Sequence, residues 1–260
     1  MAVGRRVLVF IVLAVANAAA FATAWRITGR TLLEHATMLP GSPRADAAAE
    51  RVRPALEREL ATQGLRFGAP AFVRIFKAEH ELELWLARDD GSFALFRTWP
   101  ICTWSGALGP KTRQGDGQSP EGFYRVAARQ LNPTSKYHLA FNLGYPNAYD
   151  RAHARTGDFL MVHGSCMSIG CYAMGDPAIE EIYTLVAAAL AGGQPSFEVH
   201  AFPFRFTGAD DARFADPEWG DFWRELSAGY FAFERAHVPP VVRVVGGSYA
   251  IDAGAATPAP

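Results

Sequence analysis

One short stretch of the chain holds its most reactive side chains. Residues 159–174 contain one histidine, His163, and two cysteines, Cys166 and Cys171. A cysteine needs a base to become a thiolate at neutral pH, and histidine is the side chain whose pKa suits that task. His163 and Cys171 are eight positions apart, a separation that a loop can close into hydrogen-bonding contact. The stretch therefore predicts a cysteine nucleophile with a histidine base.

A strand and a loop must position this pair. Residues 159–162 are four apolar residues in a row, which is typical of a short buried strand, and His163 follows where that strand ends. A loop of small residues then runs from Gly164 to Gly170. Gly170 has no side chain to obstruct the approach to the Cys171 sulfur. Backbone N–H groups at Cys171 and nearby could face a developing oxyanion.

The cysteines leave other chemistry open. Cys166 and Cys171 could form a structural disulfide, or one that switches the nucleophile off under oxidising conditions. Cys102 has no histidine nearby in sequence and is expected to be a buried, inert thiol. The chain has three cysteines, so at least one stays unpaired within it. A zinc site needs about four ligands, usually in two close pairs, and no second pair follows here, so we expect no metal.

The residues of the stretch resemble a known signature. His163-Gly164, followed by Ser168, Gly170 and Cys171, is similar to the active-site motif of the YkuD-type L,D-transpeptidases. That family has His-Gly, a spacer, Ser/Thr-x-Gly-Cys, an apolar residue and then Arg or Asn. Here the spacer is shorter, and Tyr172-Ala173-Met174 stands where the Arg or Asn is expected. Both departures resemble the YafK branch, which has His-Gly-x-Cys-x-Ser-x-Gly-Cys-Tyr/Phe-Ala-Met. The resemblance covers roughly residues 72–207, and Ser119-Pro120-Glu121-Gly122 resembles a Thr-Pro-x-Gly element upstream of the family's active site.

The resemblance implies a fold and a reaction. The fold is α+β and mainly β, a β-sandwich catalytic domain with flanking helices. Cys171 would attack a peptide carbonyl of a peptidoglycan stem while His163 acts as base. The Gly164 carbonyl would orient His163, and Ser168 and Gly170 would shape the oxyanion site. An amine that resolves the thioester gives transpeptidation, whereas water gives hydrolysis, including detachment of a murein-linked lipoprotein. A non-catalytic murein-binding module is the third alternative.

Residues 131–157 form a segment dense in aromatic, amide and charged side chains, as functional loops often are. We expect a strand over 138–143 and then one wall of a substrate cleft. His138 and His153 compete with His163 as bases, but neither is followed by glycine. The candidates for binding a polar peptide are Tyr145, Asn147, Arg151, Arg155 and, after the nucleophile, Tyr172.

Composition excludes several other functions. Half of the 260 residues are hydrophobic and 20% are charged, so a packed core is expected. A net charge of −1 provides no basic field for nucleic acid. The glycine-rich segment 106–119 contains neither G-x-G-x-x-G nor G-x-x-x-x-G-K-[ST], so we expect no nucleotide and no other cofactor.

The amino terminus predicts export. Arg5 and Arg6 precede an apolar run over 7–25 that ends in small residues with A-x-A patterns. We interpret residues 1–24 as a signal peptide, cleaved after Ala22 or Ala24, or as an inner-membrane anchor. Either reading places the rest of the chain in the periplasm, with membrane contact at the N-terminus in the second case.

Periodicity divides the remaining chain into three parts. Residues 25–68 are a linker and a helix over 45–62, and 69–207 form the catalytic domain. Strands are expected at 72–77, 81–88, 93–99, 123–127 and 197–202, with a helix over 176–190. Residues 208–260 form a helical extension, with a helix over 217–236, a strand at 241–245 and a tail. Arg74, Lys77, Glu81 and Glu83 are expected on a solvated face of their strands.

Overall fold

The computed structural model describes residues 39–254, so the predicted signal peptide or anchor lies outside the described part of the chain. None of the helices within 39–254 is long and apolar enough to cross a membrane. The helices are α2 (Pro43–Thr62), α3 (Ala148–Ala152), α4 (Asp176–Ala191) and α5 (Gly220–Ala236), and the 3-10 turns are Ala128–Gln130 and Ala212–Ala215.

Three sheets are built from eleven strands of the described chain. The five-stranded sheet has the order β3-β2-β1-β9-β4, with β1 and β9 parallel and the other pairs antiparallel. Its strands are β1 (Ala71–Phe76), β2 (Glu81–Ala87), β3 (Phe93–Pro100), β4 (Gly122–Ala127) and β9 (Ser196–Phe202). The four-stranded sheet has the order β5-β6-β7-β8. Its strands are β5 (Leu131–Asn132), β6 (Ala140–Asn142), β7 (Met161–His163) and β8 (Tyr172–Ala173).

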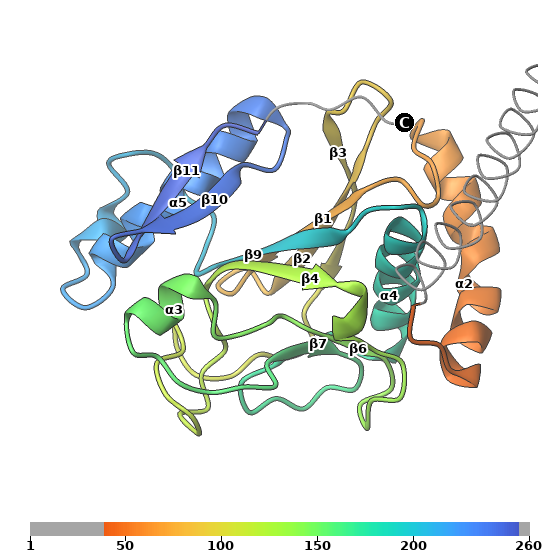
Figure 1. Ribbon diagram of the computed structural model, residues 1–260, viewed down its shortest axis with the longest axis horizontal. Helices are drawn as coiled ribbons and strands as arrows, with labels where there is room; N and C mark the ends of the chain where they lie inside the picture. The colour runs from red at the N-terminus through yellow and green to blue at the C-terminus, as the bar shows by residue number, and fades with distance from the viewer. Residues whose placement is uncertain (1–38, 255–260) are drawn as a thin grey trace, which may run out of the picture. The chain divides into compact units, whose positions relative to one another are not determined.

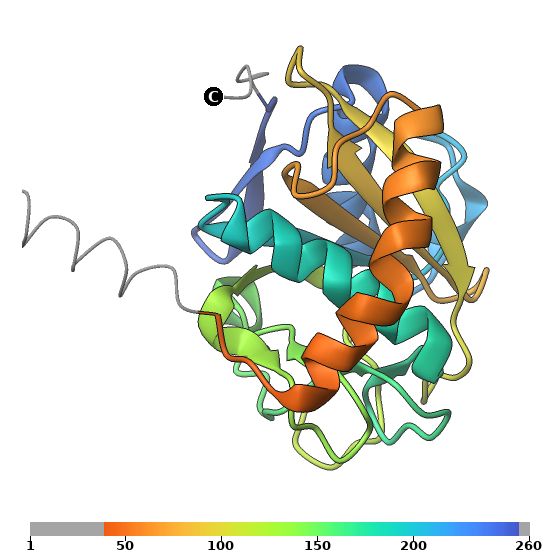
Figure 2. The ribbon, with the colours of Figure 1, turned by 90° about the vertical axis from the view of Figure 1, so that its right-hand side faces the viewer.

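Helix α4 connects these two sheets, because it contacts β1 and β9 of one and β6 and β7 of the other. It follows β8 directly and buries Ile179, Ile182 and Val186 in the larger core. Helix α2 lies alongside α4 (Figure 2) and adds Leu56 and Leu60 to the same core. Mixed sheets with a few helices confirm the predicted α+β, mainly β fold.

The second face of the five-stranded sheet is covered by the C-terminal part of the chain. Helix α5 packs Phe222, Trp223 and Tyr230 against Phe76 and Phe202, in a core that spans the predicted boundary between 207 and 208. The hairpin of β10 (Val241–Val245) and β11 (Ser248–Asp252) packs on α5. Figure 1 shows α5 beside the β10–β11 hairpin. The aromatic residues of this extension form one hydrophobic core with the sheet.

This cover corrects one prediction about charged side chains. Arg74, Lys77 and Glu83 were expected in solvent but are 1%, 0% and 4% exposed, while Glu81 is partly exposed. Alternation along β1 and β2 correctly separates two faces of the sheet, but α5 covers the face that the pattern assigned to water. Arg74 is paired with Glu234 of α5 at 2.6 Å, so the buried charge is matched from the extension itself.

Candidate active site

Strands β7 and β8 bring His163 and Cys171 together. The two strands are parallel, and the register sets Val162 opposite Tyr172 and His163 opposite Ala173. Cys171 comes two positions before Ala173. Cys171 lies one residue before β8, at the end of the loop that begins after His163. The pairing of β7 with β8 therefore brings the two ends of this loop to adjacent strands.

His163 is held in one tautomer. It is 2% exposed, and its Nδ1 lies 2.5 Å from the carbonyl oxygen of Gly164. A carbonyl only accepts, so Nδ1 carries the proton and Nε2 keeps a lone pair. Burial lowers the pKa of His163, and the hydrogen bond to Gly164 partly opposes that shift. The Tyr137 ring stacks on the imidazole with 4.7 Å between centroids, so the base is fixed in position and neutral near pH 7.

Cys171 is the free cysteine of the described chain. Burial raises the pKa of its thiol, while a backbone hydrogen bond from Met161 and the charge of Lys111 lower it. Its Sγ lies 3.7 Å from the carbonyl oxygen of Phe159, to which the thiol can donate. Both shifts favour the uncharged forms, a protonated thiol at Cys171 and a neutral imidazole at His163.

The other two candidate histidines are engaged elsewhere. His138 Nε2 lies 2.7 Å from Glu180 Oε1, at the start of α4. His153 Nδ1 lies 2.9 Å from the carbonyl oxygen of Tyr149, and its ring stacks on the Tyr149 ring. Both histidines are thus hydrogen-bonded to partners other than Cys171, which disfavours them as its base.

Two glycines of the motif occupy crowded positions. A Cβ on Gly164 would come within 2.6 Å of Asp176 Oδ1 and 2.8 Å of the Tyr137 carbonyl oxygen. The same Asp176 oxygen accepts a hydrogen bond from Ser165 N at 2.7 Å, which ties the loop after His163 to the start of α4. Gly170 has a φ of +135°, which favours glycine, and a Cβ there would meet Leu160 Cδ1 at 3.1 Å.

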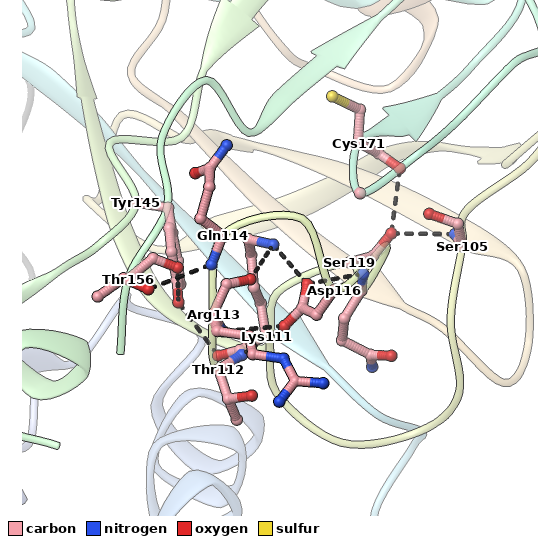
Figure 3. Close-up of polar contacts among 12 residues, drawn as sticks. Ser105, Lys111, Thr112, Arg113, Gln114, Asp116, Ser119, Tyr145, Thr156 and Cys171 are labelled. Atoms are coloured by element: carbon pink, nitrogen blue, oxygen red, sulfur yellow. Dashed lines mark hydrogen bonds and ion pairs between the residues drawn. The ribbon is translucent and has the colours of Figure 1, made fainter. Parts of the chain in front are cut away.

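Hydroxyl groups hold the main chain at Cys171. Ser168 Oγ donates to the Cys171 carbonyl oxygen at 2.6 Å, and Ser119 Oγ donates to the same oxygen at 3.1 Å (Figure 3). Ser105 N in turn donates to Ser119 Oγ at 3.1 Å. Ser168 thus contacts the nucleophile's own carbonyl. Ser105 and Ser119 were not among the predicted site residues, although the Ser-Pro-x-Gly element at 119–122 was the available signal.

A buried ion pair between Lys77 and Glu121 fixes the position of the segment 105–121. Lys77 Nζ lies 2.9 Å from Glu121 Oε1, and both side chains are 0% exposed. The ammonium also donates to the carbonyl oxygens of Ala107, Gly109 and Ser119 at 2.8, 2.8 and 3.1 Å. Burial lowers the pKa of Lys77, and Glu121 opposes that shift. Lys77, the residue directly after β1, therefore positions the segment whose Ser119 hydroxyl donates to the Cys171 carbonyl oxygen.

A second ion pair shapes the tip of this segment. Lys111 donates to Asp116, which also accepts from the backbone N–H groups of Thr112 and Arg113 at 2.9 and 3.0 Å (Figure 3). Burial raises the pKa of Asp116, but these hydrogen bonds outweigh it and bring the value to about 2. Lys111 is thus fixed as a cation whose charge reaches Cys171.

The disulfide corrects two predictions about the cysteines. Cys102 and Cys166 are bonded to each other across 64 positions, with Cα atoms 5.4 Å apart. Cys102 is therefore not an inert thiol, and Cys166 is not paired with Cys171. The bond fastens the loop between His163 and Cys171 to the segment that follows β3. The sequence could not predict this pairing, because the positions of cysteines along a chain do not determine which of them form a disulfide.

The predicted substrate-binding side chains mostly have partners inside the protein. Tyr145, Arg155 and Tyr172 are 5%, 8% and 0% exposed. Tyr172 donates to the Pro120 carbonyl oxygen at 2.6 Å, and Arg155 pairs with Asp150 at 2.9 Å. Substrate contact by the Tyr172 side chain is at odds with this burial. Asn147 caps α3 by accepting from Asp150 N at 2.8 Å, whereas Arg151 remains exposed.

No metal site is evident in the described part of the chain, where no three His, Cys, Asp or Glu side chains gather closely enough to hold an ion.

Comparison with known proteins identifies relatives over most of the chain. Residues 70–199 match the family model of the L,D-transpeptidase catalytic domain, YkuD. The chain is 48% identical over 184 residues to "Putative L,D-transpeptidase YafK" of Escherichia coli K12, which covers 71% of this chain and 74% of that protein. The protein of the same name in Escherichia coli O157:H7 gives the same figures.

Solved structures give weaker likenesses. The helical cell shape determining protein Pgp2 from Campylobacter jejuni aligns with a TM-score of 0.42 and 20% identity, over 69% of this chain and 63% of that one. Bd1075 from Bdellovibrio bacteriovorus aligns with a TM-score of 0.38 and 16% identity, over 64% of this chain and 58% of that one. This chain therefore spans less than two thirds of either protein.

Proposed function

This chain belongs to the L,D-transpeptidase family, and we propose that it acts on peptidoglycan stem peptides through a Cys171 thioester with His163 as base. One observation carries the proposal. The free thiol of the described chain comes directly before β8, which pairs with the strand that ends in a buried imidazole whose tautomer leaves Nε2 unprotonated. This arrangement supports an activated cysteine, because the base can accept the thiol proton without first losing its own.

The reaction then proceeds in two halves. His163 takes the Cys171 proton as the sulfur attacks the carbonyl of the diamino acid at the third position of the stem. Backbone N–H groups between Gly170 and Tyr172 meet the oxyanion, while Ser168 and Ser119 hold the Cys171 carbonyl and so fix this main chain. His163 returns the proton to the leaving amine. The thioester is then resolved by an acceptor amine, which releases the thiol.

The export pattern of the first 24 residues supports a periplasmic location, where peptidoglycan is accessible. The Cys102–Cys166 disulfide fits the same placement, because disulfides form and persist in oxidising compartments. We therefore place the catalytic domain on the outer side of the inner membrane, as a released protein or on an N-terminal anchor.

The test is mass spectrometry of muropeptides after incubation with the purified protein and, in parallel, with its Cys171→Ala variant. The sacculi should include some that carry a murein-linked lipoprotein. We expect new cross-linked dimers between third-position residues, or exchange of the terminal D-amino acid, with the wild-type protein alone.

Two other results would assign other functions. Loss of lipoprotein remnants without new cross-links would mean that water, not an amine, resolves the thioester. No change that depends on Cys171 would overturn the enzyme proposal and favour the murein-binding module.

A further inference from the structure

Two neighbouring cavities form an arginine-lined trough that begins beside the nucleophile. The first cavity, of about 360 Å³, is bordered by Phe159, whose carbonyl oxygen accepts from Cys171 Sγ. The second, of about 460 Å³, lies between β4, α3 and the β10–β11 hairpin. Arg125 and Gly144 border both cavities. The trough therefore runs from Phe159, which contacts the Cys171 thiol, toward the hairpin.

The trough carries an excess of positive charge. Four arginines border it, against the two carboxylates of Glu198 and Asp158. The four are Arg125, Arg129, Arg151 and Arg243. The chain as a whole has a net charge of −1, so this local excess is not a general property of the surface. Such a surface favours an anionic ligand.

Two of these arginines have no acidic partner in residues 39–254. Arg125 pairs with Glu198, and Arg243 pairs with Asp252. Arg129 and Arg151 are exposed and make no ion pair within the described chain, and Arg151 donates only to the Pro146 carbonyl oxygen. A guanidinium binds a carboxylate through two parallel hydrogen bonds, so each of these side chains can take one ligand carboxylate.

The free edge of β4 does not offer its backbone to the ligand. β4 is the last strand of the five-stranded sheet, an edge that could otherwise add a peptide strand. Its outward carbonyl groups are occupied, because Asn147 Nδ2 donates to Phe123 O at 2.9 Å and Gln130 Nε2 donates to Arg125 O at 3.1 Å. Recognition in the trough therefore depends on side chains.

We propose that Arg129 and Arg151 bind carboxylates of a peptide whose reacting carbonyl lies at Cys171, and so make the enzyme selective for acidic peptides. This inference rests on the proposed function for the position of the reacting carbonyl. Arg129 borders the cavity next to Phe159, and Arg151 borders the more distant one. A ligand that engages both must carry two carboxylates along an extended chain.

The test measures binding without turnover. Isothermal titration calorimetry with full-chain Cys171→Ala protein compares a stem tetrapeptide with the same tetrapeptide whose carboxyl groups are amidated. Adding Arg129→Ala and Arg151→Ala together should weaken binding of the acidic peptide by about tenfold or more, as expected for loss of charge-assisted hydrogen bonds. Affinity for the amidated peptide should stay the same.

Arg235→Ala is the matched control, because Arg235 is exposed on α5 and borders neither cavity. It removes one guanidinium charge outside the trough, against two inside it for the double variant, and should leave both affinities unchanged. The proposal would be overturned if the double variant and its parent bound the acidic peptide with the same affinity. It would also be overturned if the double variant lost as much affinity for the amidated peptide as for the acidic one.

Steady-state kinetics of the proteins that retain Cys171 distinguish a failure of this inference from a failure of the proposed function. With acidic peptide the double variant should show a KM raised by about tenfold at unchanged kcat. If wild-type protein turns over no peptide at all, the proposed function fails, while the calorimetric difference still decides whether the arginines bind carboxylates.

Discussion

Burial controls the protonation of the two reactive residues. It raises the pKa of Cys171 and lowers the pKa of His163, so each shift favours the uncharged form. A thiolate–imidazolium pair is therefore not the resting state. In the proposed mechanism the proton therefore moves from Cys171 to His163 only when substrate is bound, and we expect the resting thiol to react slowly with alkylating agents near neutral pH.

This protonation state predicts the pH dependence of Cys171 alkylation. Because the thiolate is the reactive form and its pKa is raised, the rate with iodoacetamide should rise about tenfold per pH unit through the neutral range. It should still be rising at the ordinary thiol pKa. Mass spectrometry after timed quenching gives the rate, and Cys171→Ala gives the background. A plateau below pH 7 would show an ion pair instead.

Gly164 offers a prediction about space. An alanine Cβ there would lie 2.6–2.9 Å from Asp176 Oδ1, the Tyr137 carbonyl oxygen and His138 Cβ. These atoms belong to two other segments of the chain, so neither can move without disturbing its own packing. Gly164→Ala should lower the free energy of unfolding by roughly 1–3 kcal/mol and displace His163. Urea denaturation measures the first effect and muropeptide turnover the second.

Gly208→Ala is the control for this change, since a Cβ at Gly208 meets nothing within 4 Å and its φ is not in the left-handed region. If Gly164→Ala and Gly208→Ala have the same stability and the same turnover, the tight packing around Gly164 affects neither folding nor activity.

At the level of elements, Lys77, directly after β1, holds the segment 105–121 through hydrogen bonds to three of its carbonyl oxygens and an ion pair with Glu121. Lys77→Met removes the ammonium and leaves the Glu121 carboxylate buried without its cation. The free energy of unfolding should fall by roughly 3–5 kcal/mol, because an unpaired buried charge is more costly than the absence of the pair. Chemical denaturation at pH 7 provides the measurement.

The double variant Lys77→Met, Glu121→Gln tests the cause. Glu121 accepts from Gly109 N on Oε1 and from Trp223 Nε1 on Oε2, and the amide oxygen of glutamine can replace only one of these acceptors. The amide carries no charge, however, so the double variant should recover part of the lost stability. Equal stability of the single and double variants would mean that the charge of Glu121 is not the source of the loss.

The sequence predicted most of the helices and strands correctly, but it did not predict which distant segments pack against them. Strands at 72–77, 81–88 and 93–99 match β1, β2 and β3 within about a residue, because alternation and turn residues are local signals. The burial of Arg74 depends on α5, whose Glu234 lies 160 positions away, and the burial of Lys77 depends on the segment 105–121. No local pattern in the sequence records these contacts. The Cys102–Cys166 pairing was missed for the same reason.

On the scale of the whole molecule, the C-terminal extension is part of the core. Phe233 of α5 is 1% exposed, and its ring lies 4.7 Å from that of Phe72 and 4.9 Å from that of Trp85, measured between centroids. Phe233→Ala should therefore cost roughly 3–5 kcal/mol of unfolding free energy. The exposed neighbour Arg235→Ala should change it by less than about 0.5 kcal/mol.

Thermal unfolding of the full chain checks both variants. A single cooperative transition that shifts as a whole with Phe233→Ala would show that the extension and the sheet unfold together. Two separate transitions, with only one of them shifted, would instead restore a domain boundary near residue 208.

The order of the cysteines along the chain has a consequence for biosynthesis. Cys102 and Cys166 both precede Cys171. A chain that emerges amino terminus first into an oxidising compartment presents the two structural thiols before the nucleophile arrives. Joining thiols in their order of emergence gives the Cys102–Cys166 bond directly, with no reshuffling. In the proposed periplasmic location, this order would leave Cys171 with no free cysteine of its own chain to pair with.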